Sequence, residues 1–382
     1  MGVRPRKRDL IGVAIPLAVT VVMLLMLGAG HHSRLTSTAA PSTSAETTAP
    51  ATTVTTTLEP PDDRPQWMHR LAPGEKPPQF VLFSFDGVGS HEHWSRLLPE
   101  AKAAGAHVTG FLSGVYLLPD ADGASYAGPG HGPGDSSIGF GGTAADVRTR
   151  VADLNAALRA GHEIGTHYNG HFCRGAEPSG GAGSAAQWNA ELDAFFAFVR
   201  RAPGLRLRTA AIKGGRTPCL EGQFDKVFAA SRAHGLAYDS SKVSTGVVWP
   251  ELRDGVWEFF LPSVRVPALG RRVIMMDYNL WYALGQAQDR PDRRDEFRAA
   301  TLQTYWEAYR AAFAGNRAPL VVANHFNDWS GGAFREALDR FLGDVCRRPH
   351  TVCATYSEVV RWLRMQDRAT LARLRAMPPA DP

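Results

Sequence analysis

The chain has 382 residues, of which 44% are hydrophobic, enough to bury a substantial core in one large domain with attachments. Its formal net charge is +5, and residues 1–9 supply +3 of this. The remainder carries only +2. That weak bias excludes a strongly basic surface, so we expect no nucleic-acid partner.

The first predicted element is an uncharged apolar run at residues 10–30, which follows a basic tail at residues 1–9. As a helix the run would span about 31 Å at ~1.5 Å per residue, close to the hydrocarbon thickness of a bilayer. Its basic flank predicts a cytoplasmic N-terminus and an exported remainder. We expect a single-pass cell-membrane protein with an extracytoplasmic C-terminal domain. A cleaved signal peptide and a secreted protein are the alternative.

The rest of the chain divides into three parts. Residues 31–76 are rich in Ser, Thr and Pro and predict a solvated linker. Residues 77–366 form the main domain, in which 118–143 are rich in Gly and Pro and predict a long surface loop. Residues 367–382 are expected to be a C-terminal tail.

Predicted strands and helices alternate along the main domain. The strands are expected at 79–85, 107–112, 162–167, 209–213, 235–239, 273–277, 319–324 and 352–355, and the helices at 92–105, 144–160, 185–201, 224–234, 296–315, 331–346 and 356–365. Such alternation predicts an α/β fold with a parallel sheet wrapped by helices. Polar residues placed just after strands favour a barrel whose site lies at the strand C-terminal ends.

Chemically capable side chains follow several of these strands. Asp86, Arg216 and His325 each come directly after a predicted strand or close to its end. His167 and His171 are four residues apart, close enough for both imidazoles to share one divalent ion. Two neutral imidazoles suit zinc, and also cobalt or nickel.

Four cysteines are present, at 173, 219, 346 and 353. An exported location permits disulfides, and an even count fits two bridges. Four cysteines allow three pairings. Proximity favours Cys346 with Cys353. A zinc site built on cysteines is the competing interpretation, but the chain has no C-x2-C pair.

Five short motifs occur in the order found in the polysaccharide deacetylases with NodB homology, carbohydrate esterase family 4. The chain resembles this family over most of residues 78–362. The matching segments are SFDG at 84–87, GTHYNGH at 165–171, RTPC at 216–219, YDSS at 238–241 and VVANH at 321–325.

The resemblance implies a distorted (β/α) barrel and a metal-dependent hydrolase that removes N-acetyl groups from a cell-envelope polysaccharide such as peptidoglycan. It implies His167 and His171 as ligands of a divalent metal, zinc above all. Asp86 would be the catalytic base, aligned by Arg216, and His325 the general acid, kept protonated by an aspartate behind it.

Further residues are candidates for the substrate groove and for a disulfide. Because Cys173 follows the second motif and Cys219 ends the third, the resemblance favours pairing them. The fourth motif contributes Tyr238 and Asp239 to the groove. Asp277, at a strand end, is a further groove candidate. The same strand end and the segment after His325 contribute three aromatic side chains that could stack on sugars or pack in the core: Tyr278, Trp281 and Trp329.

The first motif departs from the family at Gly87, where the usual form T-F-D-D has a metal-binding aspartate. Three solutions compete. Asp86 itself ligates the metal, His91 or His93 supplies the missing donor, or the site is weak or dead. The alternative function is therefore a catalytically impaired carbohydrate-binding or structural envelope protein on the same fold. A hydrolase of non-carbohydrate amides is a third reading, because fold does not fix substrate.

Overall fold

The computed structural model describes residues 65–382. The predicted basic tail, the apolar run and most of the linker lie outside these residues. Among the helices of residues 65–382, none has the length and hydrophobicity needed to cross a bilayer. Residues 65–76, predicted as linker, pack on the domain: Trp67 contacts Phe80 edge to face at 5.6 Å.

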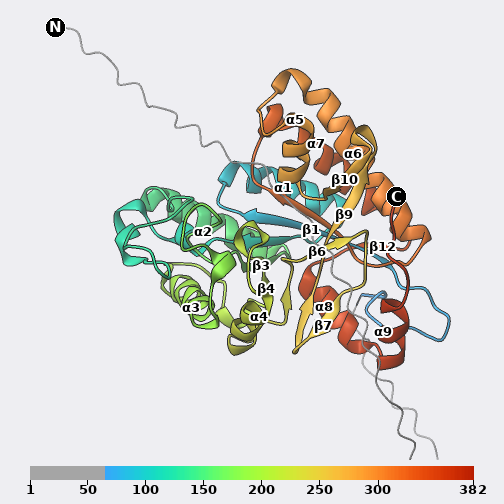
Figure 1. The fold of residues 1–382 in the computed structure, drawn as a ribbon, viewed down its shortest axis with the longest axis horizontal. Coiled ribbons are helices and arrows are strands. Elements are labelled where there is room, and N and C mark those ends of the chain that lie inside the picture. Colours follow the sequence, from blue (N-terminus) through green and yellow to red (C-terminus); the bar gives the residue numbers. More distant parts are fainter. Residues whose placement is uncertain (1–64) are drawn as a thin grey trace, which may run out of the picture. The chain divides into compact units, whose positions relative to one another are not determined.

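A mostly parallel sheet forms the centre of the domain (Figure 1). Its strands run in the order β11-β1-β2-β3-β4-β5-β8-β7, with β12 pairing to the start of β1. Only β7 is antiparallel to its neighbour. The bounds are β1 Gln79–Gly87, β2 Thr109–Leu112, β3 Glu163–Thr166, β4 Gly214–Gly215, β5 Tyr238–Asp239, β7 Glu251–Arg253, β8 Val256–Glu258, β11 Leu320–His325 and β12 Thr351–Cys353.

A smaller sheet connects the two ends of this arrangement. It contains β10 (Arg271–Ile274), β9 (Leu261–Val266) and β6 (Val243–Thr245). β6 follows β5 after three residues, and just beyond β10 Met276 bridges to Ala323 of β11. The strands therefore curl back toward β11, which gives the α/β architecture that the sequence predicted, although β11 and β7 do not pair with each other.

Helices cover the outside of the curled sheet. α1 packs between α2 and α7, α7 packs on α6, and α3 packs on α4. Figure 1 shows α2, α3 and α4 on one side and α5, α6 and α7 on the other. Their bounds are α1 His91–Ala104, α2 Ala144–Arg159, α3 Ala185–Arg201, α4 Phe224–Ala233, α5 Asp277–Gly285, α6 Arg294–Ala314, α7 Trp329–Val345, α8 Tyr356–Met365 and α9 Arg368–Arg375.

The alternation of β1 separates the core from the site. Phe83 and Phe85 point to one face, where they pack against phenylalanines of α7 and of the loop after β11. Ser84 and Asp86 point to the other face, because successive side chains of a strand alternate. Both of them contact Arg216 there. One strand thus anchors the domain and supplies the site.

Several segments differ from the sequence prediction. Residues 209–213 do not form a strand: residues 209–211 make a 3-10 turn and the strand is Gly214–Gly215, since two glycines let the chain pass close to Thr166 and Tyr238. α5 and the strands β6 to β9 were not predicted. Residues 367–382, expected to be a tail, contain α9, and Ala380 exchanges two backbone hydrogen bonds with Val247.

Candidate active site

A cleft of about 520 Å³ opens at the C-terminal ends of β1, β3 and β11. Asp86, His167, His171 and His325 line it. The parallel pairing of β1 with β11 sets Asp86 directly beside His325. Arg216 lies beneath the cleft and is fully buried. The structure therefore brings together all five residues that the sequence proposed for chemistry.

Asp86 forms a buried ion pair with Arg216, whose Nη1 donates to Asp86 Oδ1 at 2.8 Å. The same guanidinium donates to Ser84 Oγ, to Tyr356 Oη and to the backbone oxygen of Ser240. Burial alone would raise the pKa of Asp86, but the charges of Arg216 and His325 outweigh it and lower that pKa. Asp86 is therefore an ionised carboxylate held in a fixed orientation.

His167 is oriented by its backbone surroundings. Its Nδ1 lies 2.8 Å from the backbone oxygen of Arg216, and because a carbonyl only accepts, Nδ1 carries the proton. Burial lowers the pKa of His167 to about 3, so the ring is neutral and its Nε2 is available as a donor to a metal.

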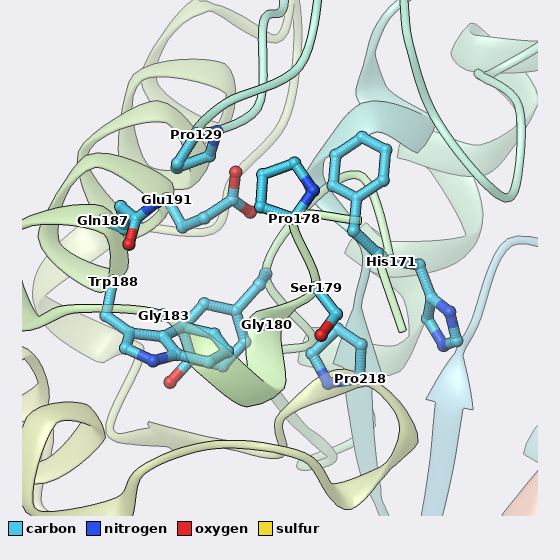
Figure 2. Close-up of a pocket in the computed structure, with 12 residues that line it drawn as sticks. Pro129, His171, Pro178, Ser179, Gly180, Gly183, Gln187, Trp188, Glu191 and Pro218 are labelled. Carbon is cyan, nitrogen blue, oxygen red and sulfur yellow. The ribbon is translucent and has the colours of Figure 1, made fainter. Parts of the chain in front are cut away.

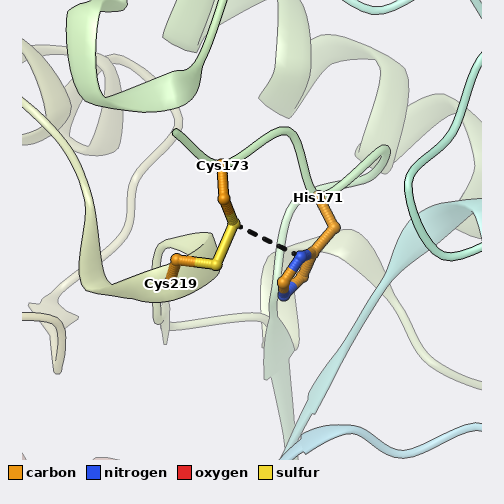
Figure 3. Close-up of side chains that lie close together, drawn as sticks. All are labelled: His171, Cys173 and Cys219. Carbon is orange, nitrogen blue, oxygen red and sulfur yellow. Dashed lines mark hydrogen bonds between the residues drawn. A yellow bond between two sulfur atoms is a disulfide. The ribbon is translucent and has the colours of Figure 1, made fainter. Parts of the chain in front are cut away.

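His171 follows four residues later, in a turn closed by a disulfide. The ring centroids of His167 and His171 are 5.2 Å apart, and burial lowers the pKa of His171 as well. Cys173 and Cys219 are joined, and Cys173 Sγ lies 3.5 Å from Nδ1 of His171 (Figure 3). Cys346 and Cys353 form the second bridge. Both predicted pairings are confirmed.

The disulfide also decides what can bind a metal near His171. Within residues 65–382, His171, Cys173 and Cys219 are the one group of metal-type side chains whose donor atoms all lie within 4.8 Å of one another. Their sulfurs are oxidised, so no thiolate is available as a ligand. Any metal site here depends on the two imidazoles and on oxygen donors.

His325 is paired with a carboxylate from another segment. Its Nδ1 lies 2.7 Å from Oδ1 of Asp277, and its backbone N–H donates to Oδ2 at 2.7 Å. Burial would lower the pKa of His325, but the charge and hydrogen bond of Asp277 outweigh it, so that pKa is raised. This is the aspartate that the family resemblance required behind the general acid. Asp277 was predicted only as a groove residue.

Neither His91 nor His93 supplies a third metal ligand. Helix α1 begins at His91, whose exposed ring bonds to Asp153 at 2.9 Å. His93 bonds to Ser90 Oγ at 2.8 Å and stacks on Phe326 at 5.2 Å. Neither of these histidines lines the cleft, because the helix start turns both away from it.

Gly87 lines the cleft at the position of the missing aspartate. It has a φ of +84°, and a Cβ placed there would meet only Tyr116 Cε2 at 3.7 Å. The space for a side chain exists, but the donor is absent. The two neutral imidazoles fit a divalent metal, and the carboxylate nearest to them in the cleft is Asp86, which Arg216 holds through Oδ1. The residues present thus fit a metal with an incomplete set of protein ligands.

Aromatic side chains stand at one rim of the cleft. Tyr278 is 43% exposed, and both Tyr278 and Trp329 line the cleft. Trp281 stacks on Trp329 at 4.8 Å. Such a surface suits the apolar face of a sugar ring.

Tyr238 and Asp239 do not line the groove, contrary to prediction. Both are buried, because β5 lies inside the curled sheet. Tyr238 donates to Glu163 Oε1 at 3.1 Å, and Asp239 accepts from the backbone N–H and the hydroxyl of Ser241. Their role is to hold the strand ends beneath the cleft.

A second, smaller pocket of about 50 Å³ lies behind the histidine turn. Figure 2 shows His171 at one edge and Trp188 and Glu191 at the opposite side. Glu191 accepts hydrogen bonds from Tyr126 Oη and from Asn169 Nδ2, and burial raises its pKa. The pocket has room for a few water molecules only. Glu191 therefore braces the turn between the two histidines.

Comparisons with known proteins give structural neighbours only. No protein-family model matches the chain, and no curated protein does. A Mycobacterium smegmatis structure described as a polysaccharide deacetylase aligns at a TM-score of 0.48 and 16% identity, over 78% of this chain and 93% of that one. A family 4 carbohydrate esterase from Streptomyces lividans aligns at 0.38 and 14% identity, over 74% and 94%.

A carbohydrate esterase family 4 pseudoenzyme from Bacillus anthracis aligns at 0.42 and 12% identity, over 78% of this chain and 69% of that chain. These neighbours are carbohydrate esterase family 4 proteins and polysaccharide deacetylases. Because the TM-scores are below 0.5, the function is inferred from the side chains of the cleft.

Proposed function

We propose that this protein is a metal-dependent hydrolase that removes N-acetyl groups from a polysaccharide. The observation that supports it is the arrangement of Asp86 and His325 beside each other at the cleft, each with its own buried partner of opposite charge. A carbohydrate-binding protein needs neither an aligned base nor an aligned acid. The two neutral imidazoles in the same cleft supply metal donors.

The side chains divide the hydrolysis of an amide between them. Asp86 accepts a proton from the attacking water, and Arg216 keeps the carboxylate ionised and aligned. His325, held protonated by Asp277, donates a proton to the departing amine nitrogen. The products are acetate and a free amino sugar. The aromatic rim formed by Tyr278 and Trp329 would orient the sugar.

His167 and His171 would hold the metal, with zinc as the first choice and cobalt or nickel as alternatives. When bound, a divalent ion there would polarise the acetyl carbonyl and lower the pKa of water. Protein donors are one fewer than in the usual site because of Gly87. We therefore propose that Asp86 keeps the role of base.

A second candidate function follows from Gly87: a carbohydrate-binding envelope protein with impaired turnover. Two imidazoles alone bind zinc poorly, so the open position favours this reading. Gly87→Asp separates the two functions. If the native chain with zinc is inert and Gly87→Asp releases acetate, the impaired protein is the correct reading.

The direct test is acetate release from a panel of substrates by the zinc-supplemented protein. We expect acetate from N-acetylglucosamine oligomers or from peptidoglycan. Peptidoglycan is the abundant N-acetylated polymer outside the cytoplasm, where the apolar run at residues 10–30 predicts that the domain lies. Acetylated peptides serve as the non-carbohydrate control. Release from the peptides but not from any saccharide would overturn the assignment of substrate class.

A further inference from the structure

Arg150 is a charged residue of the cleft that the proposed chemistry does not use. It comes from α2, is half-buried, and lines the same cleft as Asp86. Its Nε donates to the backbone oxygen of Gly89 at 2.9 Å, and its Nη1 donates to those of Tyr116 and Gly141 at 2.6 and 3.1 Å. Three carbonyl groups from separate segments therefore fix the guanidinium in place.

No carboxylate neutralises this guanidinium. Within residues 65–382, Arg150 has no acidic group within 4.0 Å, and its Nη2 makes no hydrogen bond to the described residues. The nearby carboxylates form hydrogen bonds with other groups. Asp146 caps the start of α2, Asp153 bonds to His91, and Asp120 accepts from the backbone N–H of Gly142. Burial lowers the pKa of Arg150, which is the mark of a cation that has lost water without gaining a full partner.

The charges of the cleft otherwise cancel. Asp86 is balanced by Arg216, and protonated His325 is balanced by Asp277. Among the described residues that line the cleft, Arg150 is therefore a cation at a fixed position without a carboxylate partner.

We propose that Arg150 binds a carboxylate of the substrate, so that the preferred polymer carries a carboxylate on or next to its N-acetylated sugar. This inference rests on the proposed function and narrows its substrate class from N-acetylated polysaccharides in general to acidic ones. A guanidinium anchored by backbone carbonyls loses little rotamer entropy on binding, and its remaining N–H groups suit a carboxylate. The carboxylate belongs to a uronic acid or to an acid joined to the sugar through an ether.

The test is the affinity of the full chain for a carboxylate-bearing N-acetylated oligosaccharide and for its methyl ester, measured by calorimetry with a chelator present to prevent turnover. We expect tighter binding of the acid by roughly tenfold or more, the typical effect of a charge-assisted hydrogen bond. Arg150→Gln should abolish this preference. Arg148→Gln, an exposed arginine on the same helix, removes the same charge and should retain it.

Equal affinity of the native chain for acid and ester would overturn the proposal, as would a preference that survives in Arg150→Gln. The comparison of acid and ester in the native chain needs no variant, so a folding defect in Arg150→Gln cannot obscure it. Parallel measurements with a uronic acid and with an ether-linked acid identify the source of the carboxylate. Binding is measured without turnover, so the binding result does not depend on acetate release. A failure of acetate release would contradict the proposed function without deciding whether Arg150 binds a carboxylate.

Discussion

At the scale of single residues, the bond between Asp277 and His325 controls when the proposed acid can give up its proton. Asp277 raises the pKa of His325, and His325 must be protonated to act, so activity is lost as pH rises through that pKa. Asp277→Asn removes the charge and lowers the pKa. The alkaline limb of kcat/KM for acetate release should move to lower pH, with a loss at neutral pH of about tenfold or more.

Asp328→Asn is the matched control for this change. Asp328 lies three residues after His325 in the chain and is 47% exposed, and its carboxylate pairs with Arg335. Its loss should leave the alkaline limb in place. An unchanged limb in Asp277→Asn would show that the 2.7 Å bond does not govern the acid.

Residues that directly follow strands could be located from the sequence, and residues that act through distant segments could not. Asp86, His167 and His325 sit at or beside the ends of apolar strands, and parallel strands end at one edge. Asp277 is 48 residues from His325, so no local pattern revealed their pairing. Arg150 lies in the middle of a helix, and its cleft position depends on loops at Gly89 and Gly141.

At the scale of elements, the two disulfides should differ in what they support. Cys173–Cys219 joins the turn that carries His171 to the turn after β4. Cys346–Cys353 joins the end of α7 to β12, which pairs with the opposite end of β1. We expect Cys173→Ser with Cys219→Ser to weaken zinc affinity by about tenfold or more, as loss of groups that orient ligands does.

Cys346→Ser with Cys353→Ser is the matched control and should leave zinc affinity unchanged. Both pairs of changes should lower the free energy of unfolding, by about 4 kcal/mol for the 46-residue separation and about 2 kcal/mol for the 7-residue one in the chain-entropy model. Zinc titration and denaturant unfolding measure the two effects. An equal loss of zinc affinity in both variants would contradict the assigned roles.

Helices were predictable where a cap and an apolar face coincide, and short strands were not. α3 spans residues 185–201 as predicted, because Ser184 and Gln187 form a capping box before a run of buried aromatic residues. β4 has only two residues, Gly214 and Gly215, and carries no hydrophobic pattern. Its existence depends on pairing with Thr166 and Tyr238, which are contacts that only the folded chain makes.

At the scale of the whole molecule, the alternation of strands and helices was sufficient to predict an α/β fold with its site at the strand ends. It was not sufficient to predict how the sheet curls back. The curl depends on β6, β9 and β10, which are strands of only three to six residues separated by turns. It also depends on the bridge from Met276 to Ala323. The position of the C-terminal segment likewise depends on the backbone hydrogen bonds between Ala380 and Val247, which are far apart in sequence.

The central claim is that the cleft hydrolyses N-acetyl groups with a metal held by His167 and His171. The most direct measurement is acetate release from an N-acetylated oligosaccharide by chelator-stripped protein before and after zinc is restored, with zinc content determined in the same samples. We predict release that appears with zinc and is absent in His167→Ala, which should also fail to retain the metal. Full zinc occupancy without acetate release, or equal release by the stripped protein, would contradict the claim.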